Sequence, residues 1–366
     1  MTQAAVLDAV IAEDRPLIAR AKRGDDKAML RVAADLTRDL HVAKPLIYWG
    51  DLLLSALIGY SGLALAITSG GVLAWVAGVV AVLGLYRAGS FIHELTHVKH
   101  ATLPGFRRLW NLLIGVPLLV PAFMYEGVHN LHHNKTRYGT VDDPEYLPLA
   151  LMKPWTLPLF VVASILAPVA LLFRFAVLTP LSLLSPRLRA IVVARYSGLQ
   201  INPKFQRRAP EGEMKRQWLG QEAACSLWAL TLIGTFAAGV LPTRAFLIFL
   251  AVASAVLLLN QVRTLVAHLW ENEGEVMSVT AQYLDSVNVP PPATLPALWA
   301  PVGLRYHALH HLLPGLPYHA LGEAHRRLSA ALEEGSPYHE ASYRGLPLLV
   351  SRLVRSSWRG GAIPRS

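Results

Sequence analysis

The sequence contains a single cysteine, Cys225, among its 366 residues. One cysteine cannot close a disulfide within the chain, and it cannot supply the several thiolates of a structural zinc site or an iron–sulfur cluster. Any metal bound by this chain must therefore be held by histidine and carboxylate side chains. The start of the chain also lacks the pattern of a secretory signal peptide.

Charged residues are scarce as well. They make up 16% of the chain, whereas a soluble domain usually carries about a quarter. Hydrophobic residues account for 53%, and the mean hydropathy is +0.38, which indicates a membrane protein. The formal net charge is +10. Because the basic residues flank apolar runs and no nucleic-acid module is recognisable, we expect no nucleic-acid partner and attribute this charge to the cytosolic excess of Lys and Arg in membrane proteins.

Four apolar runs are each near the roughly 20 residues needed to cross a bilayer. The connections between them are short, Ser69-Gly70-Gly71 and Pro242-Thr243-Arg244, so the runs should pair into two helical hairpins. The four predicted spans are residues 46–68, 72–92, 220–241 and 245–267. Two further runs are less suited to crossing, since 109–124 is short and 157–178 contains Pro168, which kinks a helix.

Charge predicts the orientation of these segments. Residues 181–220 and residues 1–44 are both rich in Lys and Arg and should be cytosolic. A single crossing by 157–178 would place 181–220 outside, so we expect 109–124 and 157–178 to lie in the interface or to dip in and out of the membrane. Asp51 and Arg87 lie at similar depth in the first hairpin, and we expect them to pair with each other; contact with a substrate is the alternative.

The predicted fold is therefore an all-α integral membrane protein with two transmembrane helical hairpins, interfacial helices and a cytosolic helical cap. We expect a cytosolic amphipathic N-terminal region over residues 1–44, a membrane domain over 45–330, and a cytosolic C-terminal tail over 331–366. The expected location is a bacterial inner membrane, with both termini in the cytosol.

Eight of the fourteen histidines fall into three tight clusters. These clusters are His93-Glu-Leu-Thr-His97, His129-Asn-Leu-His132-His133 and His307-Ala-Leu-His310-His311. Spacings of three and four place side chains on one face of a helix, so each cluster should present its imidazoles in one direction. With four spans, all three clusters meet on the cytosolic side. Imidazole suits zinc, copper, iron and nickel, and eight or more ligands are too many for one metal and suit two.

A ninth candidate ligand is His268, which follows the last predicted span at the same membrane face. His100 is either a ligand or a group that supports one. We expect His41 at the surface, and three other histidines at the surface or supporting the ligands: His319, His325 and His339. Acidic residues that could orient the ligand rings are Glu94, Glu126, Asp142, Asp143 and Glu271.

At these residues the chain resembles the membrane fatty acid desaturase and hydroxylase superfamily. Three histidine boxes in this order around two hairpins are the signature of that superfamily. Residues 310–318, His-His-Leu-Leu-Pro-Gly-Leu-Pro-Tyr, are similar to the sequence that follows its third box. Asp143-Pro144 and residues 263–268 are also similar to it, and the resemblance covers residues 45–330.

The resemblance implies two non-haem irons, with O2 as co-substrate and a fatty acyl chain as substrate. Carried over to this chain, the ligands would be His93, His97, His129, His132, His133, His268, His307, His310 and His311. We expect desaturation of the acyl chain; the alternatives are hydroxylation and oxidative decarboxylation to a terminal alkene. Leu309 stands where many fatty acyl desaturases have an acidic residue, so the reaction within the superfamily stays open.

The chain has no His-Pro-Gly-Gly motif of a cytochrome b5 domain. Electrons are therefore expected from an external carrier, a ferredoxin-like or cytochrome b5-like donor with its reductase. Membrane lipid is the other expected partner.

Two alternatives come from other functional classes. His93-Glu94-x-x-His97 matches the H-E-x-x-H of zinc proteases, which supplies two ligands and a general base, so an intramembrane zinc protease is one alternative. That alternative leaves the other two clusters unexplained. The second alternative is a metal-binding membrane protein without catalytic activity.

Overall fold

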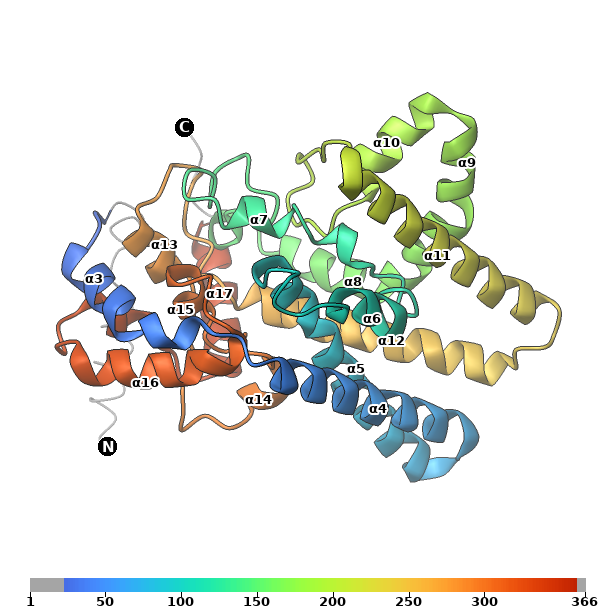
Figure 1. Ribbon diagram of the computed structural model, residues 1–366, viewed down its shortest axis with the longest axis horizontal. Coiled ribbons are helices and arrows are strands. Elements are labelled where there is room, and N and C mark those ends of the chain that lie inside the picture. Colours follow the sequence, from blue (N-terminus) through green and yellow to red (C-terminus); the bar gives the residue numbers. More distant parts are fainter. Residues whose placement is uncertain (1–22, 361–366) are drawn as a thin grey trace.

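The computed structural model describes residues 23–360, and within that range every regular element is a helix (Figure 1). The first part of the predicted N-terminal region, residues 1–22, lies outside the described residues, as do residues 361–366. The α-helices are α3 (Lys27–Leu36), α4 (Pro45–Thr68), α5 (Gly71–His97), α6 (Phe106–Trp110), α7 (His129–His132), α8 (Thr156–Phe173), α9 (Thr179–Leu184), α10 (Pro186–Tyr196), α11 (Gly212–Ala237), α12 (Thr243–Leu265), α13 (Val279–Asp285), α14 (Pro296–Trp299), α15 (His307–Leu312), α16 (Leu321–Ala331) and α17 (Leu346–Gly360). Short 3-10 helices occur at Arg38–His41, Ala122–Met124, Leu149–Leu151, Tyr318–Ala320 and Pro337–Ala341, and π-helical turns at Asn111–Gly115 and Arg174–Leu178.

Helices α4 and α5 form the first predicted hairpin, and their backbones lie in close contact. A Cβ atom on Gly84 would lie 2.6 Å from the backbone nitrogen of Gly59. A Cβ atom on Gly62 would lie 2.7 Å from the backbone nitrogen of Ala81. Small residues at such contacts let membrane helices approach closely and pack by van der Waals contact. This packing holds α5 in place, and α5 carries the first histidine cluster at its C-terminal end.

The charged pair predicted inside this hairpin is present. Arg87 donates from Nε to Asp51 Oδ1 at 2.7 Å and from Nη2 to Asp51 Oδ2 at 2.5 Å. The hydroxyl of Tyr318 donates to the same carboxylate at 2.9 Å, so the pair also fastens the C-terminal half of the chain to the hairpin. Ser55 adds a fourth hydrogen bond at 3.2 Å.

Helices α11 and α12 are joined by a short turn but diverge from it (Figure 1). Phe236 stacks on Phe246 beside the turn, with ring centroids 4.5 Å apart. Beyond this contact α11 packs on the segments around Phe123 and Phe175, whereas α12 packs against α5 and α8. The second predicted hairpin is therefore a splayed pair whose helices serve different parts of the fold.

Four helical segments are long and apolar enough to cross a membrane: Pro45–Thr68, Gly71–His97, Thr156–Leu184 and Thr243–Leu265. The predicted spans 46–68, 72–92 and 245–267 correspond to three of them. The predicted span 220–241 is not among them, because the part of it that lies in α11 begins with Gly220, Gln221 and Glu222, which lower its mean hydropathy. The fourth segment is instead 156–184, which contains the run 157–178 that we expected to lie in the interface or to dip in and out of the membrane.

The segment from α8 to α10 leaves the histidine-bearing end of the molecule and returns to it. At its start, Leu157 packs with Tyr146 and Leu265. At its far end, the backbone N–H of Ile201 donates to the carbonyl of Pro144 at 2.9 Å. Both ends are therefore tied to the same loop after the second histidine cluster. This geometry agrees with an excursion that dips in and out, and it differs from a single crossing.

The run 109–124 forms α6, a π-helical turn and a short 3-10 helix rather than one long helix. Trp110 and Ile114 are buried against α5 and its surroundings, and the indole N–H of Trp110 donates to the carbonyl of Ala88 at 2.8 Å. The run therefore packs beside the first hairpin as a chain of short turns.

A helical cap covers the histidine-bearing ends of the long helices. Its core joins α3, α13, α15 and α16 around buried Tyr283, Leu309 and Tyr338. The described residues after 330 pack on the rest of the protein, since Tyr338 and Ala341 are fully buried in this core and Leu349 and Leu353 of α17 are buried in two neighbouring clusters. In α17 the cause is local, because apolar residues such as Leu346, Leu349, Val350 and Leu353 recur at helical spacing and give the helix one apolar face.

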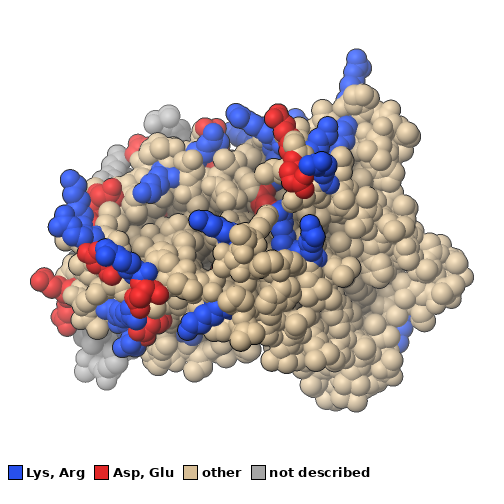
Figure 2. All heavy atoms as spheres, viewed as in Figure 1, with Lys and Arg blue, Asp and Glu red and all other residues tan. Residues whose placement is uncertain are grey.

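Charged side chains gather over the cap and along its border with the long helices, whereas the far ends of α4, α5, α11 and α12 are almost free of charge (Figure 2). Large apolar side chains are exposed along these helices, including Leu54, Leu57, Trp75, Leu227 and Leu247. A surface of this kind is expected where helices face lipid.

Candidate metal centre

The nine predicted ligands converge between the long helices and the cap. His93 and His97 stand on the last turn of α5, and the second cluster forms α7 and its C-terminal cap. His268 follows α12 by three residues, and the third cluster lies on α15. Each of the nine side chains is buried or half-buried, and together they form two groups.

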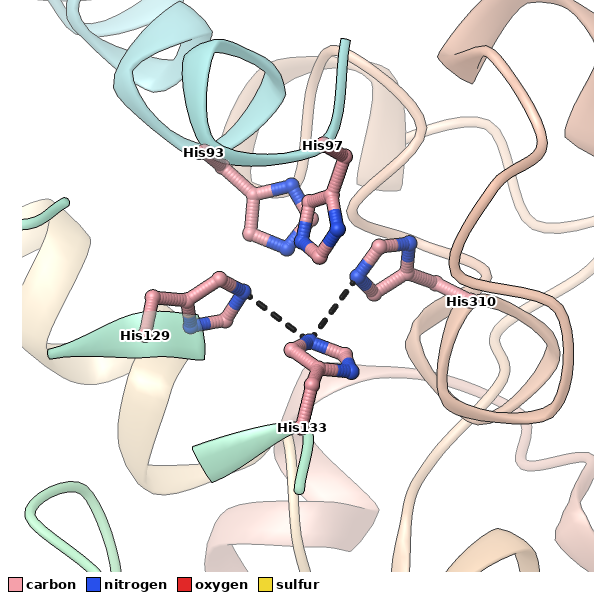
Figure 3. A group of neighbouring side chains, drawn as sticks. All are labelled: His93, His97, His129, His133 and His310. Atoms are coloured by element: carbon pink, nitrogen blue, oxygen red, sulfur yellow. Dashed lines mark hydrogen bonds between the residues drawn. The ribbon is translucent and has the colours of Figure 1, made fainter. Parts of the chain in front are cut away.

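The first group joins five imidazoles from all three clusters: His93, His97, His129, His133 and His310. One ring nitrogen of each lies within 4.8 Å of one ring nitrogen of every other. The Nε2 atom of His133 is 3.0 Å from Nε2 of His129 and 3.1 Å from Nε2 of His310. Figure 3 shows the five rings turned toward a common centre.

The second group joins four imidazoles: His132, His268, His307 and His311. The Nε2 atom of His307 is 3.0 Å from Nε2 of His268 and 3.2 Å from Nε2 of His311. The two groups touch, since the rings of His133 and His311 stack with centroids 4.3 Å apart and an interplanar angle of 18°. The centre can therefore hold two metal ions side by side.

The H-x-x-H-H clusters are each divided between the two groups. In the second cluster, His129 and His133 enter the first group and His132 enters the second. In the third cluster, His307 and His311 enter the second group and His310 enters the first. Helix geometry explains this division, because neighbouring positions differ by about 100° around the axis while positions four apart differ by only about 40°. Our expectation that each cluster presents its imidazoles in one direction is therefore wrong for the second and third clusters.

The nitrogen geometry fits metal binding. Two ligand nitrogens about 2.1 Å from one metal ion lie about 3 Å apart when the bonds meet at a right angle, which matches the 3.0–3.2 Å contacts. Buried ring nitrogens also lack hydrogen-bond partners, among them both nitrogens of His93 and Nε2 of His97. A bound cation would satisfy these lone pairs, and imidazole sets of this kind suit iron among other transition metals.

Carboxylates and hydroxyls hold the outer nitrogens of three ligands. Nδ1 of His132 lies 2.9 Å from Asp143 Oδ2, and Nδ1 of His129 lies 2.8 Å from the Tyr125 hydroxyl. Each contact keeps the proton on Nδ1 and leaves the lone pair of Nε2 facing the centre. Asp143 is itself fully buried and accepts the backbone N–H of Gly139 at 2.8 Å, so the loop after α7 is shaped around this carboxylate.

The third such ligand is His268, whose Nδ1 lies 2.8 Å from the Tyr138 hydroxyl and 3.2 Å from the Ser286 hydroxyl. Tyr138 donates in turn to Asp285 at 2.8 Å. Burial raises the pKa of Asp285 to about 7, and it raises the pKa of Glu145, which lies 3.2 Å from His129 Nδ1, to about 7 as well.

Burial also keeps most of the ligands neutral. It lowers the pKa well below the ordinary value for His129, His133, His268, His307, His310 and His311. Burial acts on His132 in the same direction, but the Asp143 carboxylate outweighs it and raises the pKa of that imidazole. Neutral imidazoles have the lone pair that a metal ion requires.

The acidic residues proposed to orient ligands have different surroundings. Asp143 contacts a ligand, as expected, and Glu94 Oε1 lies 3.7 Å from His93 Nδ1. Glu126 instead pairs with Arg107 outside the two groups, and Glu271 pairs with Arg352 at 3.1 Å. Asp142 is exposed and contacts no ligand.

The five remaining histidines lie outside both groups. They pair with Arg107, the Gly315 carbonyl, the Lys44 N–H, the Tyr338 hydroxyl and the Leu332 carbonyl, in the order His100, His41, His319, His325 and His339.

Several orienting residues escaped prediction: Tyr125, Tyr138, Glu145, Asp285 and Ser286. Glu145 lies only two residues after Asp143, so its proximity to the second cluster was a usable signal. Tyr138 and Asp285 are brought together from positions 147 residues apart, and no local pattern marks them.

Comparison with known proteins places this geometry in context. The model of the fatty acid desaturase family matches residues 69–342, a range that contains all nine histidines. The chain is also 50% identical over 336 residues to a ceramide hydroxylase of Caulobacter vibrioides, and the match covers 92% of this chain and 95% of that relative.

Proposed function

This chain belongs to the fatty acid desaturase family, and from that premise we propose that it is a lipid hydroxylase that acts on an acyl chain linked through an amide, as in a ceramide. It is an integral membrane oxidoreductase of a non-haem di-iron family. The observation that carries the proposal is the 50% identity to a ceramide hydroxylase over nearly the whole chain. Hydroxylation was the alternative in the sequence analysis, and this relative favours it over desaturation.

We propose that the nine histidines are the iron ligands, five on one iron and four on the other. Two irons held in this way would supply the O2-dependent, two-electron oxidation of an unactivated C–H bond. One oxygen atom of O2 would be inserted into the C–H bond. The other would be reduced to water by two electrons from an external carrier and would take up two protons. The carrier is a ferredoxin-like or cytochrome b5-like protein.

The residues of the chain perform three tasks in this proposal. Asp143, Tyr125 and Tyr138 hold the ligand rings so that Nε2 faces the irons. The cap and the long helices bury the ligands and keep water out. The exposed apolar helices embed the protein in lipid, so that a lipid substrate reaches the centre from the bilayer. We further propose that the cap and the termini face the cytosol of a bacterial cell.

The zinc-protease alternative gains no support from this arrangement. Glu94, its candidate general base, accepts the Tyr48 hydroxyl at 2.5 Å and the Tyr318 backbone N–H at 3.2 Å. His93 and His97 share their group with three further histidines, which a single-zinc hydrolase would leave without a role.

The proposal is tested with iron-loaded protein in detergent, a short-chain ceramide, isotopically labelled dioxygen and a ferredoxin reducing system. Mass spectrometry should find a product that has gained one labelled oxygen atom. His133→Ala should abolish turnover, whereas His339→Ala, which lies outside both groups, should retain it. Loss of two hydrogens would assign the chain to desaturation instead. Release of CO2 with a terminal alkene would assign it to decarboxylation, and zinc with no O2 uptake would overturn the di-iron assignment.

A further inference from the structure

A small cavity lies beside the second histidine group. Arg263 and His307 line one part of it, and apolar side chains from α14, from the residues just after α12 and α14, and from segment 287–289 line the rest: Val266, Ala267, Val287, Val289, Trp299 and Leu304. The space suits a water-sized polar group rather than a whole acyl chain. His307 is the only one of the nine histidines that lines this cavity.

Arg263 is a buried cation that forms no ion pair among residues 23–360; the Tyr86 hydroxyl and, at longer range, the Glu145 carboxylate are polar groups that interact with it. The exposed fraction of Arg263 is 8%, and among residues 23–360 no carboxylate lies within salt-bridge distance of it. Nη2 donates to Asn260 Oδ1 at 3.3 Å, and Nε has no acceptor. An arginine stays charged at all relevant pH values, and a buried charge with an unmet donor is strongly unfavourable unless a ligand supplies the acceptor.

His307 lines the same cavity and carries a second unmet donor. Its Nε2 atom faces His268 and His311 inside the second group, so the ring proton belongs on Nδ1. Nδ1 is buried and has no acceptor in the part of the chain that the structure describes. Imidazoles that bind a metal almost always donate this second N–H to an oxygen atom. One acceptor oxygen in the cavity would therefore satisfy both Arg263 and His307.

Arg305 lines the same cavity but is already satisfied. Its Nε donates to the carbonyl of Val289 at 2.8 Å, and Nη2 donates to the carbonyl of Ala293 at 2.8 Å. Arg305 therefore builds the wall, and the free donor belongs to Arg263. The outer wall is α14, which packs on α5 and α12 and carries exposed Leu298 on a surface suited to lipid.

We propose that Arg263 Nε and His307 Nδ1 donate to the amide carbonyl oxygen of the lipid substrate. This inference rests on the proposed function, because it assumes a substrate with an acyl amide. An oxygen atom held at Nδ1 lies on the outer edge of the His307 ring, across the imidazole from Nε2 and the second histidine group, so it would fix the carbonyl at a set distance from that group. Arg263 is thus a binding residue that selects an amide-linked substrate and sets the position of oxidation a few bonds from the carbonyl.

The test measures binding without turnover. Iron-loaded protein, kept free of O2 and reductant, is titrated with a short-chain ceramide and with its thioamide analogue, in which sulfur, a weaker acceptor, replaces the carbonyl oxygen. The wild type should prefer the amide. Arg263→Gln should weaken amide binding by about 10- to 100-fold, as expected for loss of a charged hydrogen bond, and should no longer distinguish the two ligands. Arg263→Lys should recover part of the preference, and Arg208→Gln, which removes an exposed cation, should match the wild type.

Iron content and product analysis separate the possible failures. Arg263→Gln should keep its iron and should spread the hydroxyl group over more carbons of the acyl chain. Equal binding of both ligands by the wild type, or unchanged binding by Arg263→Gln, would refute the inference even if ceramide is hydroxylated. Loss of iron in both Arg263 variants would also refute it, since the arginine would then support the metal centre. If the wild type prefers the amide but no ceramide is hydroxylated, the proposed function fails and the binding site stands.

Discussion

Replacing Gly84 by alanine should push the first hairpin apart. The added Cβ would lie 2.6 Å from the backbone nitrogen and 2.7 Å from the Cα of Gly59, and 3.0 Å from the backbone carbonyl oxygen of Ser55. All three atoms belong to the backbone, which cannot rotate away as a side chain can. The two helices must therefore separate or slide along the contact, and α5 would carry the first histidine cluster with it.

The magnitude follows from two opposing effects. Overpacking a close contact costs about 1–3 kcal/mol, whereas alanine in place of glycine inside a helix favours folding by about 0.5–1 kcal/mol. Gly78 lies on the same helix with no atom within 4 Å of its added Cβ, so Gly78→Ala shows the second effect alone. Both variants share the second effect, so they should differ by the overpacking cost alone, about 1–3 kcal/mol, which corresponds to roughly 1–4 °C in the apparent melting temperature of a chain of this length.

The assay is thermal unfolding in detergent, followed by tryptophan fluorescence at one heating rate for both variants. Gly84→Ala should melt below the wild type and should retain less iron, and Gly78→Ala should melt at or above it. If Gly84→Ala and Gly78→Ala have the same apparent melting temperature, the close backbone contact does not determine stability and the reasoning is refuted.

Three further predictions concern the metal centre, a buried charge cluster and the topology. Asp143→Asn should lower iron retention or activity by about 10- to 100-fold because this buried carboxylate orients the ring of His132, and exposed Asp142→Asn should not. Wild-type iron content by elemental analysis together with wild-type turnover would contradict this role. Glu222→Gln leaves two arginines without their shared carboxylate and should destabilise the protein by about 3–5 kcal/mol in detergent melts, whereas Glu213→Gln, at an exposed ion pair, should leave the melting temperature unchanged. A cysteine at position 208 (Arg208→Cys) should react with a membrane-impermeant thiol reagent from the cytosolic side only. Cys225 is buried and should give no background labelling. Labelling from outside would show that the excursion 156–198 crosses the membrane.

The metal centre was predicted from sequence to an unusual extent. The histidine clusters are local patterns, and spacings of three and four are recorded in the chain whatever the fold does with them. His268 was found from its place at the end of an apolar run. The division of the histidines into two groups required the structure, because it depends on how α7 and α15 are turned relative to α5 and to His268, and the tertiary packing sets the orientation of such short helices.

The topology shows the limits of apolar runs. By length and composition the predicted span 220–241 is not among the segments that could cross a membrane, whereas the run 157–178, which we expected to lie in the interface or to dip in and out, belongs to one that could. Gln221 and Glu222 lower the hydropathy of α11, while α8 is uniformly apolar. Glu222 is nevertheless buried, where it accepts Arg174 at 2.6 Å and Arg189 at 2.7 Å. A hydropathy criterion counts such a residue against a membrane span. Only the structure shows that its charge is buried beside two arginines.

The sequence by itself determined the all-helical class, the membrane setting, the first hairpin and the identity of all nine clustered histidines, since composition and helical periodicity are properties of neighbours along the chain. The tertiary structure decided how the nine histidines divide, which carboxylates and hydroxyls orient them, and where Arg263 and His307 are left with unmet donors. Tyr138 contacts Asp285 across 147 residues of sequence, and His268 lies beside His307 across 39 residues. Contacts of that range depend on the packing of the whole chain, and no local pattern records them.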